Sequence, residues 1–98
     1  MPSYLVETYV PRAKAHEVEA TGVRLRAVVA DLQREGTPVR FVRTTLLPDD
    51  ETCFHVLDAP STADVELVCR RAGLVRVRVV TAVEEPSAIS ELASGDMT

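Results

Sequence analysis

Three side chains that could share one metal ion occur on two stretches that read as β-strands. Glu7 lies in the stretch 3–10, and Cys53 and His55 lie two residues apart in the stretch 52–57. Neighbouring strands are about 4.8 Å apart, a span that one divalent ion bridges with ligand bonds of about 2.1 Å when both side chains point to the same face. Imidazole and carboxylate suit nickel, zinc or cobalt, and a thiolate can join them. The residues therefore predict a metal site with Glu7 and His55 as ligands and Cys53 as a third.

Two other interpretations use the same region. A single histidine on a strand is more often structural than a ligand, and Glu7 could instead form an ion pair with Arg78 or His55. Alternatively, Tyr9, Arg43 and Arg78 could hold an anionic or aromatic small molecule. That version keeps the fold and changes the function.

Composition narrows the class of protein. A chain of 98 residues forms one domain with a single core. Its net charge of −4 argues against nucleic-acid binding, which needs a basic face. No apolar run approaches the ~20 residues that span a bilayer, and Glu7 interrupts the N-terminal stretch where a signal peptide would be apolar. We therefore expect a cytoplasmic protein with both cysteines reduced and neither a nucleic-acid nor a membrane partner.

The hydrophobic patterns predict six elements in residues 1–85. Alternation favours strands at 3–10, 39–47, 52–57 and 76–84. Helical spacing favours a long helix over 13–35, with a buried stripe of Val18, Gly22, Leu25, Val29 and Leu32. Ser61 and Asp64 resemble a capping box that starts a second helix, and Gly73 ends it. Residues 86–98, which include Pro, Ser and Gly, predict a mostly flexible tail.

This order of elements, βαββαβ, predicts an α+β ferredoxin-like sandwich. In it, two helices cover one face of a four-stranded antiparallel sheet, and we expect the two central strands to run parallel. The other face of the sheet is then open. Such a face must be polar or be covered by a partner.

Choosing the more apolar side of each strand assigns side chains to the two faces. The expected helix-covered face contains Tyr4, Val6, Thr8, Val10, Phe54, Val56, Val77, Val79 and Val83. The expected open face contains Leu5, Glu7, Tyr9, Phe41, Arg43, Thr45, Cys53, His55, Leu57, Arg78, Val80 and Ala82. Exposure of its apolar side chains to water is unfavourable, so we expect a homodimer in which the two sheets pack against each other. The alternative is a monomer whose tail folds across this face.

Four short segments resemble a known family. They are YLVE from Tyr4 to Glu7, VRFVRTTL from Val39 to Leu46, the pattern C-x-x-x-x-x-A-P from Cys53 to Pro60, and RRAGL from Arg70 to Leu74. The chain thereby resembles small actinobacterial ferredoxin-like proteins of unknown function, a family that includes a nickel-binding protein. The resemblance implies a dimeric ferredoxin-like fold and, for at least one member, nickel binding. A broader similarity to dimeric α/β-barrel proteins implies, by fold analogy alone, a small-molecule enzyme that uses the cavity between the sheets.

Overall fold

The computed structural model describes residues 1–83. These form, in order, β1 (Ser3–Tyr9), η1 (Arg12–Glu17), α1 (Val18–Arg34), β2 (Arg40–Leu47), η2 (Pro48–Asp50), β3 (Thr52–Asp58), α2 (Thr62–Arg71) and β4 (Arg78–Ala82), where η marks a short 3-10 helix. The expected tail at 86–98 lies outside the described residues. Within residues 1–83, neither α-helix combines the length and hydropathy that a membrane-spanning segment requires.

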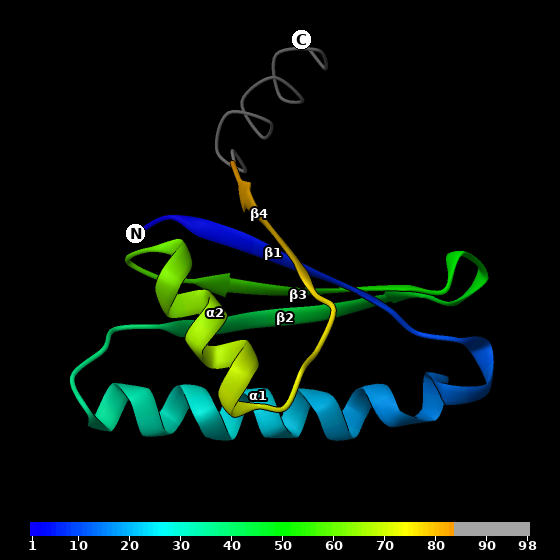
Figure 1. Cartoon of the computed structure of the whole chain (residues 1–98), viewed down its shortest axis with the longest axis horizontal. Coiled ribbons are helices and arrows are strands. Elements are labelled where there is room, and N and C mark those ends of the chain that lie inside the picture. The colour runs from blue at the N-terminus through cyan, green and yellow to red at the C-terminus, as the bar shows by residue number, and fades with distance from the viewer. Residues whose placement is uncertain (84–98) are drawn as a thin grey trace, which may run out of the picture.

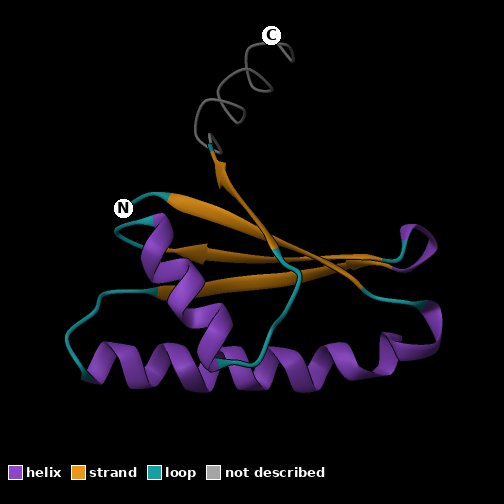
Figure 2. Cartoon of the chain, in the orientation of Figure 1, coloured by secondary structure: helices purple, strands orange, loops and turns teal. Residues whose placement is uncertain are grey.

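The four strands form one sheet in the order β2-β3-β1-β4, and α1 and α2 lie on the same side of it (Figures 1 and 2). The predicted α+β ferredoxin-like sandwich is confirmed. The expectation of a parallel central pair is wrong, because β1 and β3 pair antiparallel. Helix α1 returns the chain to the end of the sheet where β1 began, so β1 and β2 run the same way. The tight connection at η2 then reverses β3.

The helix-covered face of the sheet packs on an apolar stripe of α1. Gly22, Leu25, Val29 and Leu32 are buried as the spacing predicted, whereas Val18, the fifth residue of the predicted stripe, is only partly buried. The first turns of the expected helix form the separate 3-10 helix η1, which contributes no buried residue. Most helices in proteins are stabilised by burial of an apolar stripe. Contacts with the core therefore stabilise α1, whereas η1 lacks such contacts.

Helix α2 begins and ends at the residues that its sequence indicated. The Ser61 side chain accepts a hydrogen bond from the Asp64 backbone N–H at 3.3 Å, which satisfies one of the free donors of the first turn. Val65, Val68 and Cys69 are buried against the sheet. Gly73 follows the helix with φ of +76°, a conformation that costs glycine little.

The expected face assignment is wrong for β3. Its partners across the pair with β1 are Tyr4↔Leu57, Val6↔His55 and Thr8↔Cys53. Since directly opposed residues of paired strands point to the same side, Cys53, His55 and Leu57 lie under the helices with Tyr4 and Val6. Phe54 and Val56 lie on the open face. Leu57 and the following Ala59 belong to the main core, and they determine which side of β3 faces the helices.

A break in register divides β2 between the two faces. Phe41 pairs with Leu57 and Arg43 pairs with Val56, with a β-bulge between them. Phe41 therefore points to the helix-covered face, where the guanidinium of Arg26 from α1 lies 5.0 Å from its ring centre. Arg43 and Thr45 point to the open face as predicted, whereas the outward placement of Phe41 is wrong. One extra residue on a strand reverses alternation, and alternation alone cannot reveal it.

Candidate functional site

Glu7 and His55 do not form a joint site, because they lie on opposite faces of the sheet. Glu7 is paired with Phe54 and Arg78 in the ladder, whereas His55 is paired with Val6. On the open face Glu7 forms an ion pair with Arg78, with 3.6 Å between Nη1 and Oε1. This is one of the two ion pairs that the sequence offered as an alternative. Tyr9 and Arg43 also lie on the open face, and the Tyr9 side chain is largely exposed.

Cys53 and His55 lie together beneath the helices. Both are buried, with exposed fractions of 0% and 1%. The Sγ atom of Cys53 lies 3.8 Å from Nε2 of His55, and Oγ1 of Thr44 lies 2.8 Å from Nδ1 of the same ring. A neutral imidazole donates a hydrogen bond from one ring nitrogen and accepts one at the other. Thr44 and Cys53 therefore give both ring nitrogens of His55 a partner. Thr44 thereby fixes the plane of the ring from the neighbouring strand.

Burial keeps this pair uncharged. It lowers the pKa of His55 below its ordinary value. It also raises the pKa of the Cys53 thiol, an effect that a hydrogen bond with Thr8 partly offsets. Near neutral pH the pair is therefore a thiol next to a neutral imidazole rather than the thiolate–imidazolium pair of a cysteine nucleophile. The chemistry available is hydrogen bonding, or coordination of a soft cation.

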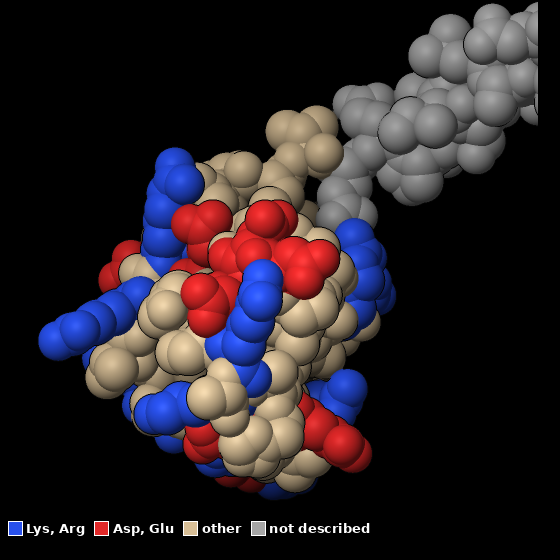
Figure 3. Space-filling model, turned by 90° about the vertical axis from the view of Figure 1, so that its right-hand side faces the viewer, with Lys and Arg blue, Asp and Glu red and all other residues tan. Residues whose placement is uncertain are grey.

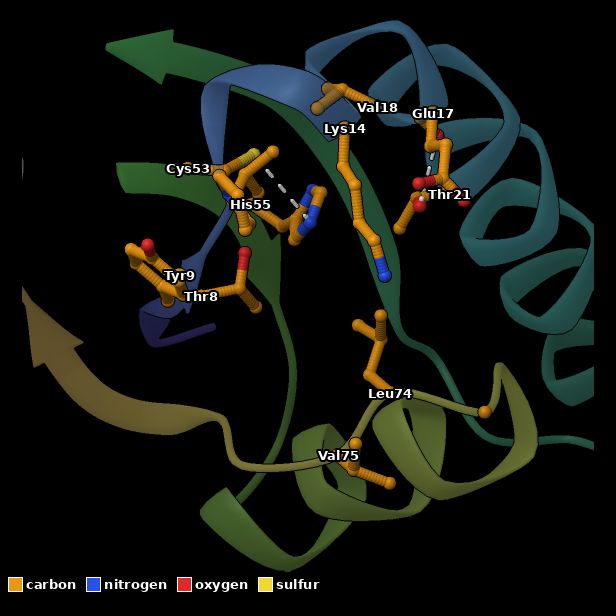
Figure 4. Close-up of a pocket in the computed structure, with 13 residues that line it drawn as sticks. Thr8, Tyr9, Lys14, Glu17, Val18, Thr21, Cys53, His55, Leu74 and Val75 are labelled. Atoms are coloured by element: carbon orange, nitrogen blue, oxygen red, sulfur yellow. Dashed lines mark hydrogen bonds between the residues drawn. The ribbon is translucent and has the colours of Figure 1, made fainter. Parts of the chain in front are cut away.

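A cavity of about 230 Å³ extends from this pair to the surface. Strands β1 and β3 form its floor, η1 and the start of α1 form one wall, and the segment from Gly73 to Val75 forms the opposite wall (Figure 4). The lining combines three kinds of side chain. The apolar ones are Val10, Pro11, Val18, Leu74 and Val75; the polar ones are Thr8, Thr21, Cys53 and His55; the charged ones are Lys14 and Glu17. Tyr9 also borders the cavity, although its side chain belongs to the open face.

The 3-10 helix η1 closes one side of this cavity and is attached to the β2–β3 turn. The backbone N–H of Arg12 donates to Oε2 of Glu51 at 2.8 Å, and the backbone N–H of Val10 donates to the Glu51 carbonyl at 2.8 Å. Nη2 of Arg12 lies 3.8 Å from Oδ1 of Asp49. Figure 3 shows acidic side chains gathered at this end of the molecule, with basic side chains lying among them. Contacts with the turn, rather than core packing, therefore hold η1 over the cavity.

The donor atoms fit a metal site only in part. Within residues 1–83, no three His, Cys, Asp or Glu side chains gather closely enough to hold an ion. Cys53 and His55 provide a sulfur and a nitrogen on the same side of the sheet. Protein zinc sites use three or four protein ligands, so this pair supplies part of such a set.

Several lining residues were not identified from the sequence. The position of Thr44 could have been predicted from the hairpin. If the turn at 48–51 pairs Leu47 with Thr52, antiparallel pairing also places Thr44 opposite His55. No sequence pattern indicated that Lys14 and Thr21 line a cavity, since both occupy positions that the helical pattern assigns to solvent. Leu74 and Val75 enter the cavity wall because the chain turns at Gly73, and the sequence does not show where that segment packs.

Comparison with known protein families, with curated proteins and with solved structures finds no match.

Proposed function

We propose that this protein binds a small organic molecule in the cavity between the sheet and η1. The observation that carries the proposal is the buried His55 at the floor of a 230 Å³ cavity with mixed polar and apolar walls. Ligand sites in proteins are mostly apolar concavities in which a few fixed polar groups orient the ligand. Here the hydroxyls of Thr8 and Thr21 supply the polar groups, because both ring nitrogens of His55 are already bonded. Val18, Leu74 and Val75 supply the apolar surface. This places the ligand on the opposite side of the sheet from Arg43 and Arg78.

A fragment screen by NMR tests this proposal. We expect small polar aromatics and small organic acids to shift the backbone amide signals of residues 8, 14, 53 and 74 in the ¹⁵N-labelled protein. Thr21→Phe places a ring inside the cavity and should abolish these shifts. Thr45→Phe is the matched control, because Thr45 is exposed on the open face and lies outside the cavity lining. Shifts that survive Thr21→Phe, or that map to the open face, would contradict the proposal.

We propose nickel binding as a second candidate, with Cys53 and His55 as ligands and without Glu7. The separation of 3.8 Å between Sγ and Nε2 supports it, because bonds of about 2.3 Å to sulfur and 2.1 Å to nitrogen bring both atoms to one tetrahedral ion with little movement. The raised pKa of Cys53 opposes it, because coordination requires the thiolate. Affinity should therefore increase as pH rises.

Isothermal titration with nickel chloride tests this candidate. We expect Cys53→Ser and His55→Gln each to weaken nickel binding, and the double variant to show none. Glu7→Gln is the control, since Glu7 lies on the far side of the sheet and its loss should change nothing. Equal affinity of wild type and the double variant would exclude this site. Loss of binding in Glu7→Gln would return Glu7 to the ligand set.

The open face supports a homodimer in which two sheets pack together. Leu5, Phe54 and Val80 lie on this face, and neither α1 nor α2 covers it. Apolar surface of this kind is stabilised when a second copy covers it. The open face and the cavity are on opposite sides of the sheet, so dimer formation would leave the cavity accessible.

Sedimentation equilibrium tests the dimer. We expect wild type to sediment with twice the mass of the chain, and Leu5→Arg to sediment as a folded monomer. A monomeric wild type at 100 micromolar concentration would exclude dimerisation through this face.

A further inference from the structure

The charged side chains of the cavity indicate which class of molecule it accepts. Of the thirteen lining residues, only Lys14 carries a positive charge at neutral pH, because burial keeps His55 neutral. Lys14 projects from η1, and Figure 4 shows its side chain extending across the cavity toward Leu74. Among residues 1–83, no carboxylate forms an ion pair with its ammonium group. The cation thus faces the cavity without a counterion from the part of the chain that the structure describes.

The one acidic lining residue has a different position. Glu17 stands where η1 meets α1, and its backbone carbonyl accepts a hydrogen bond from Thr21 at 3.2 Å. In Figure 4 its side chain lies beside Thr21, at the α1 side of the cavity, whereas Lys14 extends toward the opposite wall. A ligand lying between His55 and Leu74 therefore meets the ammonium group rather than the carboxylate.

The walls of the cavity limit the remainder of such a ligand. Val18, Leu74 and Val75 give it apolar surface, and the hydroxyl of Thr8 lies beside Cys53. A volume of about 230 Å³ matches a short hydrocarbon body with one charged head group. We propose that the cavity selects small monocarboxylates, with Lys14 as the contact for the carboxylate and Val18, Leu74 and Val75 as the contact for the hydrocarbon part. This inference rests on the proposed small-molecule function and adds a ligand class to it.

A reporter cysteine inside the cavity measures this charge preference without a known ligand. The background is Cys53→Ser with Cys69→Ser, and the reporter is Thr8→Cys, whose side chain points into the cavity (Figure 4). The measured quantity is its rate of reaction with three methanethiosulfonates of similar size: a neutral methyl, an anionic sulfonatoethyl and a cationic trimethylammonioethyl reagent. Both charged reagents react with the same thiolate, so the ratio of the anionic to the cationic rate does not depend on the fraction of the thiol that is ionised. The same protein unfolded in urea supplies the reference ratio.

We expect this ratio to exceed the reference about tenfold, as a unit charge a few ångströms away in a partly screened site would produce. Lys14→Gln should return the ratio to the reference value. Glu17→Gln is the matched control and should leave the ratio unchanged or raise it. A ratio that Lys14→Gln does not alter would overturn the inference. Failure of all three reagents to react would remove the accessible cavity, and with it the proposed function.

Protection of the same reporter then tests the ligand class directly. Isobutyrate should slow the neutral reagent at a concentration about tenfold lower than isobutyramide requires, and isobutylamine should give no protection. Lys14→Gln should make the acid and the amide equivalent. Equal protection by acid and amide in wild type would refute the preference for carboxylates and leave small-molecule binding intact. Absence of protection by every probe, with a reactive reporter, would contradict both proposals.

Discussion

Leu57→Ala is expected to lower the free energy of unfolding by about 3 kcal/mol, the usual effect of removing a buried leucine side chain from a core. Leu57 is 1% exposed and packs in the main core with Leu25, Val29 and Val65. The surrounding side chains belong to both helices and the sheet, so the vacated space cannot close without moving a whole element. Urea denaturation followed by circular dichroism measures the change.

Leu47→Ala is the control for this measurement. Leu47 lies on the same hairpin, is the same residue type and is 40% exposed, so its truncation should change the free energy of unfolding by less than about 1 kcal/mol. The comparison also tests the direction of β3. If Leu57 faced the open side, as the choice of the more apolar side of β3 suggested, the two variants would have similar effects.

Acidification below pH 6.5 is expected to destabilise the protein through His55. Burial lowers the pKa of His55 in the folded state, whereas the unfolded chain has the ordinary value of about 6.5. Between the two values the unfolded state binds more protons than the folded state, so the free energy of unfolding falls as pH falls. The loss begins near the unfolded pKa and ends below the folded one. Its steepest slope is about 1.4 kcal/mol per pH unit for this one group.

The groups around the ring explain why it resists protonation. Thr44 and Cys53 occupy its two nitrogens, and neither is a carboxylate that would stabilise an imidazolium ion. Glu17 lines the same cavity, but neither a hydrogen bond nor an ion pair joins it to His55 within the described part of the chain. Desolvation of the ring is therefore not offset by an opposite charge.

Denaturation curves between pH 5 and pH 8 isolate this effect. His55→Gln should remove the component of the slope that arises from the ring, even where it lowers stability overall. His16→Gln is the control, because it removes the other histidine of the chain, which is exposed on η1. Parallel pH profiles for wild type and His55→Gln would show that the ring titrates equally in both states.

The sequence alone predicted the fold class, most of the buried stripe of α1, and the start and end of α2. The stripe of α1 and the start and end of α2 depend on residues within a few positions of each other, namely periodic apolar side chains, Ser61 and Gly73. These features can be predicted from sequence, because helical periodicity and capping hydrogen bonds involve residues of a single element. The open sheet face follows from the order of elements and needed no further information.

The candidate site was decided by contacts between strands, which no single strand encodes. Judged by side-chain polarity, Cys53 and His55 belonged outside and Phe54 and Val56 inside. The pairing of β3 with β1 and the burial of Leu57 and Ala59 reversed that choice. The hydrogen bond between Thr44 and the ring of His55 offsets part of the cost of burying a histidine. A shift of one residue in register exchanges the two faces of a strand, so the tertiary structure alone placed Glu7 and His55 apart and brought Lys14 to the cavity.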